Sequence, residues 1–313
     1  MTEIETGIRA VLTGAAVGDV LGATWEFRSP EDIPQRGRLA VQGGGPFAWP
    51  PGAFTDDTDL LLAAAFSYGE RNGAPAFSEE GFLARLLDWF AAGPRDVGMQ
   101  TGHACHHWRR ARTPLPADEA AQGNGGLMRA APHGLLHADA ATAWAAAAAD
   151  TRLTHPSAFA AACSGFLAAV LWRLLWEGEA EWRALLASLP PSPAHERLRR
   201  HLAALSPGGP PPREEGGWCL HTLRLALWAL DSGLDYEEAI QRVIRTGGDT
   251  DTNACVAGAL LGARWGLAAI PRDWAEAITP EGQARLEAAT RHLAGLTPQA
   301  KNRSSTILPS STV

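Results

Sequence analysis

The stretch Gly247-Gly248-Asp249-Thr250-Asp251-Thr252-Asn253-Ala254 decides how this chain of 313 residues is interpreted. Two glycines lead into two aspartates with neighbouring hydroxyl residues, and an apolar run with helical spacing follows. Paired glycines allow positive φ or close approach of the backbone to a ligand, which a simple helix cap does not need. Beyond them, small residues recur at every fourth position (Ala254, Gly258 and Gly262), so one helix face is smooth. We therefore expect a buried helix with acidic residues at its N-terminus.

A second small-residue stripe lies near the start of the chain. Gly14, Gly18 and Gly22 also recur every four positions, and Glu26 extends the stripe by one turn. Two smooth faces permit close helix packing, and an antiparallel pair would bury both helices centrally. That arrangement would place Glu26 beside the acidic start of the later helix. The alternative is that each stripe packs against a different element.

A second acidic cluster, Thr55-Asp56-Asp57-Thr58, lies between a Gly/Pro-rich loop and an apolar helical run. By itself it is typical of a helix N-terminus, where Thr and Asp cap exposed N–H groups. The two clusters together contain more carboxylates than capping needs. If they meet in space, four carboxylates repel one another unless cations intervene. Because the candidate ligands are all hard oxygens, the pattern favours Mg²⁺ or Mn²⁺ over zinc.

The rest of the chain predicts an all-α fold. It is rich in Ala and Leu at helical spacing, and strand signals are scarce. We expect one compact multi-helix domain over residues 1–296 and a disordered polar tail over 297–313. Two further segments, 30–53 and 190–217, are expected to be irregular, the second as a surface insertion. The expected helices span about 4–25, 56–71, 79–92, 97–112, 139–150, 157–178, 218–231, 236–245, 252–266 and 282–294.

Composition narrows the class of protein. The formal charge of −7 and the pI near 5.8 give no basic footprint, so bulk binding of nucleic acid is not expected. Four widely spaced cysteines suit free thiols in a reducing compartment. The N-terminus is a poor signal peptide, and the apolar run Leu167–Trp176 is short and contains Arg173, so no membrane span is expected. A cytoplasmic location follows as an expectation.

Several sequence blocks together resemble one family. In chain order they are Gly18–Phe27, Phe54–Thr58, Gly123–Pro132 and Gly247–Ala254, with weaker agreement at Asp88–Thr101 and Leu153-Thr154-His155. This set resembles the ADP-ribosylglycohydrolase family, which includes dinitrogenase-reductase-activating enzymes and crystallin J1-like proteins. The blocks cover roughly residues 7 to 266, and the last acidic motif is the most specific.

The resemblance implies an all-α fold with a binuclear Mg²⁺ or Mn²⁺ centre. The metal ligands it implies are Thr55, Asp56, Asp57, Asp249, Asp251 and Thr252. Glu26 and Asp96 would be the catalytic carboxylates. The substrate-binding residues it implies are Gly123, Asn124, Gly125, Gly126, Met128, Arg129 and His155. Gly126 departs from the family pattern, in which Ser or Ala is common, and this leaves the substrate subtype open.

The expected activity is metal-dependent hydrolysis of the glycosidic bond between ADP-ribose and a protein side chain or another acceptor. The partners would be an ADP-ribosylated protein or a small ADP-ribosyl conjugate. Two alternatives stay open: a non-catalytic, crystallin-like ADP-ribose binder, and a di-metal phosphohydrolase that cleaves the diphosphate. A binder would have lost acidic ligands, whereas the reaction products separate the two enzymes. The sequence does not name the acceptor.

Overall fold

Two antiparallel helices form the centre of the computed structural model, which describes residues 2–178, 181–213 and 216–297. They are α1 (Glu3–Gly22) and α12 (Thr250–Trp265), and residues 10–22 of the first and 250–262 of the second are buried. The glycine stripes face each other. A Cβ atom added at Gly14 would overlap the backbone of Gly258, and one at Gly18 would overlap that of Ala254. The predicted central helix pair is therefore confirmed.

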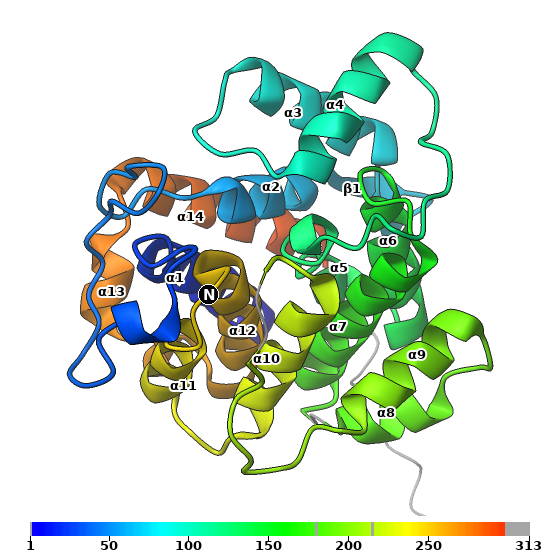
Figure 1. Cartoon of the computed structure of the whole chain (residues 1–313). Helices are drawn as coiled ribbons and strands as arrows, with labels where there is room; N and C mark the ends of the chain where they lie inside the picture. The colour runs from blue at the N-terminus through cyan, green and yellow to red at the C-terminus, as the bar shows by residue number, and fades with distance from the viewer. Residues whose placement is uncertain (1, 179–180, 214–215, 298–313) are drawn as a thin grey trace, which may run out of the picture.

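The other helices surround this pair (Figure 1). Helices α10 and α11 pack against α12, α14 packs against α1, and α6 packs on α7. The remaining α-helices have the following bounds: α2 Asp56–Ala65, α3 Glu79–Ala91, α4 Met99–Ala111, α5 His133–Leu136, α6 Ala140–Arg152, α7 Ala158–Trp176, α8 Trp182–Ser188, α9 Pro193–Leu202, α10 Cys219–Asp231, α11 Tyr236–Ile244, α13 Arg272–Ala277 and α14 Pro280–Leu296. Three 3₁₀ turns lie at Pro30–Asp32, Asn124–Gly126 and Leu267–Ala269.

Most of the long helices begin at a polar side chain that the sequence marks clearly. The side chain of the residue before the helix accepts a hydrogen bond from a backbone N–H of the first turn, which satisfies a donor that would otherwise lack a partner. The capping residues are Thr2, Thr55, Ser78, Asp139, Ser157, Ser192, Asp235 and Thr279. Helix α12 is an exception, because Asp249 precedes it without capping it.

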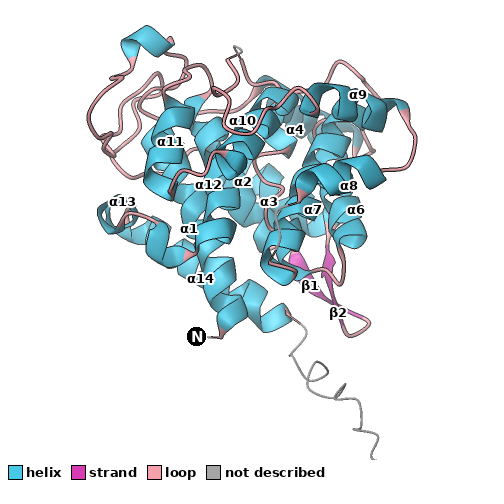
Figure 2. Cartoon of the chain, turned by 90° about the horizontal axis from the view of Figure 1, so that it is seen from below, coloured by secondary structure: helices cyan, strands magenta, loops and turns pink. Residues whose placement is uncertain are grey.

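Two predicted helices are too long. The helix expected over 56–71 ends at Ala65, and an antiparallel hairpin follows, with β1 at Tyr68–Arg71 and β2 at Ala74–Phe77 (Figure 2). The turn between the strands has positive φ at Asn72 and Gly73, which a helix does not allow. The helix expected over 4–25 ends at Gly22, so Glu26 does not continue it.

The segment 190–217 was predicted to be irregular, but it contains the helix α9. Ser192 caps this helix, and Leu198 and Leu202 are buried on one of its faces. The short helices α5, α8 and α13 were not predicted either; at four to seven residues they are too short to show a clear period. The predicted disordered tail, 298–313 in particular, lies outside the described residues.

One described helix, α7, is long and apolar enough to cross a membrane by length and composition. It is longer than the run Leu167–Trp176 that the sequence marked. In the structure, 78% of its most apolar window is buried inside the protein. It therefore serves as a core helix here, packed against α6.

Candidate metal centre and active site

Asp19 on α1 fixes the first acidic cluster. Its carboxylate accepts hydrogen bonds from the backbone N–H groups of Thr55 and Thr58 and a short one from the Thr58 hydroxyl. Thr55 adds a second cap, since its Oγ1 accepts a bond from the N–H of Asp57 at 3.2 Å. The start of α2 is thus satisfied without the carboxylates of Asp56 and Asp57. Both remain available for another role.

The second cluster is aligned by the central pair and by a short bridge. Gly22 lies against the backbone of Thr250 and Asp251, and the Thr250 hydroxyl donates to the carbonyl of Gly22 at 2.8 Å. Beyond the end of α1, Arg28 and Gly248 form an antiparallel bridge. This bridge, rather than a further helical turn, places Glu26 beside the start of α12.

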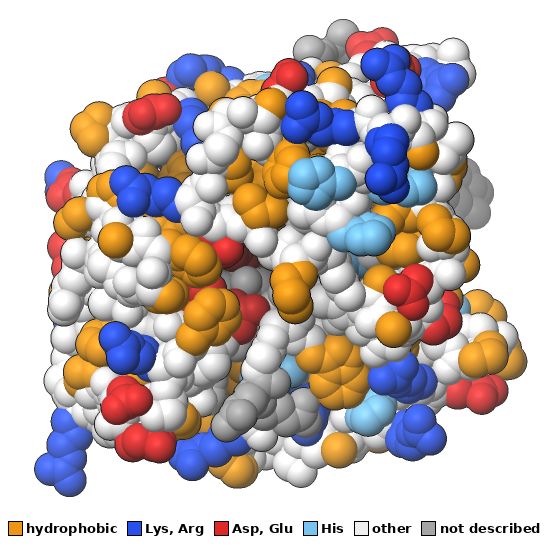
Figure 3. Space-filling model, turned by 45° about the horizontal axis from the view of Figure 1, so that its top comes forward, with side chains coloured by type: hydrophobic (Ala, Val, Ile, Leu, Met, Phe, Trp, Pro, Cys, Tyr) orange, Lys and Arg blue, Asp and Glu red, His pale blue; other side chains and the backbone are white. Residues whose placement is uncertain are grey.

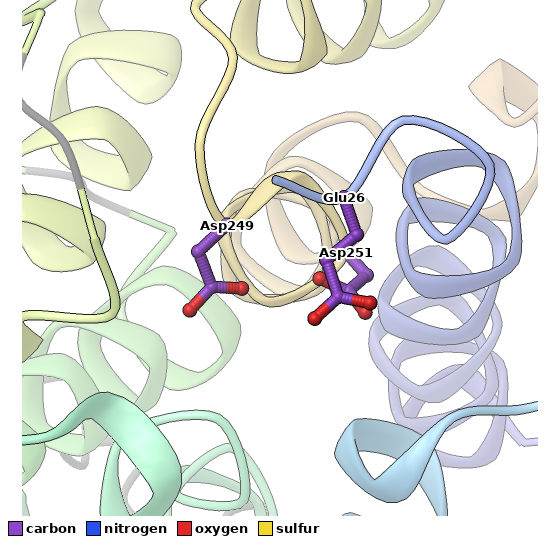
Figure 4. A group of neighbouring side chains, drawn as sticks. All are labelled: Glu26, Asp249 and Asp251. Carbon is purple, nitrogen blue, oxygen red and sulfur yellow. The ribbon is translucent and has the colours of Figure 1, made fainter. Parts of the chain in front are cut away.

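The acidic residues meet in space, as expected if the stripes pair. One carboxylate oxygen from each of Glu26, Asp249 and Asp251 lies within 4.8 Å of the others, and all three side chains are buried (Figure 4). The hydroxyl of Thr252 donates to Oδ2 of Asp57 at 3.1 Å, which links the clusters directly.

Capping does not explain the second cluster. The side chain of Asp249 makes no capping bond to α12. Its Oδ2 instead accepts a hydrogen bond from Nδ2 of Asn124 at 2.8 Å, and that amide also contacts the Thr222 hydroxyl at 3.1 Å. Oδ1 of Asp251 accepts a hydrogen bond from the N–H of Thr252, in the first turn of α12, at 3.0 Å. Neither bond accounts for the meeting of the Asp249 and Asp251 carboxylates with that of Glu26 in one shared space.

Burial and mutual repulsion make this cluster costly for the protein alone. Burial, followed by the charge of Asp249, raises the pKa of Glu26 to about 8. Burial together with neighbouring carboxylates raises the pKa of Asp56, Asp57 and Asp251 well above the usual range. The pKa of Asp96 is also raised, chiefly by burial. Each raised pKa means that the ionised carboxylate is disfavoured unless a positive charge lies beside it.

A cavity of about 390 Å³ lies over the cluster. Acidic side chains are recessed in a hollow on this face, with apolar side chains around it (Figure 3). The predicted site residues that line the cavity are Glu26, Asp56, Asp57, Asp96, Gly123, Asn124, Gly125, Met128, His155, Asp249, Asp251 and Thr252. The structure thus gathers predicted residues from six separate stretches of the chain at one place.

Three of the predicted site residues do not line this cavity. Thr55 lies behind Asp57, to which its hydroxyl is bonded. A Cβ atom at Gly126 would lie 2.5 Å from Cγ2 of Thr151, so this glycine faces α6. Arg129 lies in the predicted substrate loop, but its guanidinium is fully buried and bonds Asp150, Thr154 and the carbonyl of Gly125.

A family model described as ADP-ribosylglycohydrolase matches residues 2–303. The chain belongs to the ADP-ribosylglycohydrolase family. It is 28% identical over 285 residues to ADP-ribosylarginine hydrolase Tri1 of Pseudomonas putida (strain GB-1), covering 86% of this chain and 73% of that one. It is also 28% identical to the ADP-ribosyl-[dinitrogen reductase] glycohydrolase of Rhodospirillum rubrum, covering 83% and 86%.

A solved structure titled ADP-ribosylglycohydrolase-related protein complex superposes with a TM-score of 0.75 at 31% identity. The match covers 95% of this chain and all of that one. The predicted all-α fold and the predicted enzyme class, a glycosidic-bond hydrolase, are both confirmed.

The sequence interpretation of this glycohydrolase missed several residues that build the site. Asp19 is visible in the sequence only as a carboxylate inside an apolar run, which by itself indicates no role at the site. Gln100 accepts a hydrogen bond from the N–H of Gly123 at 2.9 Å, and Thr222 connects Asn124 to Asn253. Phe27 and Met99, both exposed, line the cavity mouth. No local pattern marks these residues, because their partners are distant in the sequence.

Proposed function

We propose that this glycohydrolase holds two Mg²⁺ or Mn²⁺ ions in its acidic cluster and hydrolyses the glycosidic bond between ADP-ribose and a protein side chain. The observation that carries the proposal is a set of buried carboxylates that meet in one place, Asp249 among them without a capping bond to α12. Such groups repel one another in a protein interior, and divalent cations relieve that repulsion.

The donor set fits hard cations. Asp56, Asp57, Asp249, Asp251, Thr55 and Thr252 offer only carboxylate and hydroxyl oxygens, which Mg²⁺ and Mn²⁺ prefer. Oδ1 of Asp57 and Oε2 of Glu26 are buried and have no hydrogen-bond partner among the described residues. Orphaned buried oxygens are rare, and a cation would satisfy them.

In hydrolysis, water adds to the anomeric carbon, the bond from that carbon to the acceptor breaks, and the acceptor leaves with a proton. Bound divalent ions would stabilise negative charge and orient the ribose hydroxyls. Glu26 and Asp96 line the cavity, and in this proposal they carry the proton from water to the leaving group. The loop at Gly123–Gly125 and His155 bound the side of the cavity where the rest of the nucleotide would lie.

Protein arginine is the first acceptor to test, because the Pseudomonas relative is called an ADP-ribosylarginine hydrolase. A panel of ADP-ribosylated arginine, serine and small conjugates would rank the acceptors.

The variant Asp251→Asn tests whether Asp251 binds a metal ion, and a helix-capping aspartate provides the matched control. Asp235→Asn is the control, since Asp235 does cap a helix, accepting a bond from the N–H of Glu238 at 2.9 Å. Without metal, Asp251→Asn should melt at or above the wild-type temperature, because it removes repulsion. It should lose the rise in melting temperature on adding Mg²⁺ and should lose turnover. The control should keep both. Near-normal turnover and metal response in Asp251→Asn would leave only a structural role for this residue.

A further inference from the structure

Arg129 is the hub of a buried hydrogen-bond network behind the cavity. Its Nε lies 3.0 Å from a carboxylate oxygen of Asp150, and both side chains are fully buried. Its Nη1 donates to the carbonyl of Gly125 at 2.7 Å. Its Nη2 donates to the carbonyl of Asp150 at 3.0 Å and to Oγ1 of Thr154 at 2.9 Å. Arg129 therefore joins the cavity loop to the end of α6.

The Thr154 hydroxyl connects this hydrogen-bond network to His155. Its Oγ1 lies 2.8 Å from Nδ1 of His155. A guanidinium has donors and no acceptor, so Thr154 must accept from Arg129, and its own hydrogen must go elsewhere. Nδ1 of His155 is the other partner recorded for that hydroxyl among the described residues. If Nδ1 carried a hydrogen, two donors would converge on the hydroxyl and its own hydrogen would be left without an acceptor.

The other side of the ring faces the cavity. His155 lines the cavity, and its Nε2 has no recorded hydrogen bond to a described residue. Gly123 and Gly125 leave room along that edge: added Cβ atoms would lie 3.1 Å from Nε2 and 2.9 Å from Cε1, respectively. Burial, followed by the charge of Arg129, lowers the pKa of His155 to about 3, so the ring is neutral. A neutral ring has one N–H.

We propose that Arg129, acting through the Thr154 hydroxyl, holds His155 in the tautomer with its hydrogen on Nε2, and that this N–H donates to an oxygen of the ADP-ribosyl group. Arg129 and Thr154 are thus positioning residues: they reach the substrate only through His155. The inference rests on the proposed function for the identity of the ligand. The tautomer itself does not depend on that function.

Nitrogen NMR of the full chain with ¹⁵N-labelled histidine tests the tautomer directly. The signal of His155 is the one that disappears in His155→Gln. In the ligand-free wild type, we expect Nδ1 to lack a hydrogen and Nε2 to carry one. In Thr154→Val, which keeps the shape but removes the hydroxyl, we expect the pattern to change, and in Thr154→Ser we expect it to return. A wild-type spectrum with hydrogen on Nδ1 would overturn the inference.

Calorimetric titration with ADP-ribose measures the consequence for binding. Losing one oriented donor should weaken the affinity of Thr154→Val about tenfold, and Thr154→Ser should restore it. Thr154→Val with wild-type affinity and an unchanged spectrum would refute the relay. If Thr154→Val does not fold, the wild-type spectrum still decides. A wild type that neither binds ADP-ribose nor cleaves its conjugates would refute the proposed function and leave the tautomer result standing.

Discussion

Replacing Gly22 with alanine tests how tightly the central helix pair holds the active site. An added Cβ atom at Gly22 would lie 2.5 Å from Cα of Asp251 and 2.5 Å from the carbonyl oxygen of Thr250. Carbon atoms in normal contact are about 3.5–4.0 Å apart. Because both obstacles are backbone, the start of α12 must move by about 1 Å. Asp251 moves with it.

The expected loss of stability is modest. Overpacking of a tight core contact costs about 1–3 kcal/mol. Alanine is better than glycine in a helix by up to about 1 kcal/mol, and less at a helix end. The net loss is therefore on the order of 1–2 kcal/mol, which lowers the melting temperature by about 2–4 °C per kcal/mol in a chain of this size. The displaced carboxylate should also reduce the stabilisation by Mg²⁺.

Gly7→Ala is the matched control in the same helix. Its added Cβ atom would meet only Cδ2 of Leu175, at 3.2 Å, and the end of a leucine side chain can shift. Thermal melts of both variants, with and without Mg²⁺, provide the assay. If Gly22→Ala melted like Gly7→Ala and kept the full metal response, the tight contact between α1 and the acidic turn would be refuted.

Three further predictions concern Asp19, His155 and the removal of divalent cations. Asp19→Ala should lower the free energy of unfolding by several kcal/mol, because each donor left without an acceptor costs about 1–3 kcal/mol. Asp19→Asn should lower it less. Urea denaturation measures both variants. Because burial lowers the pKa of His155 to about 3, the unfolded chain binds an extra proton below about pH 6.5. Wild-type stability should therefore fall from pH 6.5 towards pH 3, by up to about 1.4 kcal/mol per pH unit, and His155→Gln should flatten this slope in urea melts. Chelation should lower the melting temperature, and Mg²⁺ at a hundred times its dissociation constant should restore about 2.7 kcal/mol, whereas an unchanged melt would contradict a resident cation.

Most of the fold can be predicted from the helical spacing of small and apolar residues in the sequence. The stripes at Gly14, Gly18 and Gly22 and at Gly258 and Gly262 identified the central pair and its direction, because close backbone contact leaves room for nothing larger. The acidic turns before α2 and α12 were visible for a similar reason, since carboxylates beside glycines in an apolar setting are costly without a ligand.

Features that depend on distant partners were not predictable in the same way. The helix predicted over 56–71 wrongly includes the first strand of the hairpin at Tyr68–Phe77, because that strand is defined by its pairing with residues 74–77. Arg129 lies in a glycine loop that suggested substrate contact, but Asp150, which binds it, comes from the distant helix α6. Glu26 was placed correctly beside α12 for a partly wrong reason, because a bridge at Gly248 holds it rather than a helical turn.

Product identification tests the central claim most directly. The protein is incubated with an ADP-ribosylarginine protein and Mg²⁺ or Mn²⁺, and mass spectrometry identifies the small-molecule product and the mass of the target. The account predicts free ADP-ribose, a target restored to its unmodified mass, no product after chelation, and recovery when metal is added back. Release of AMP with a ribose-phosphate left on the target, or undiminished turnover without metal, would contradict it.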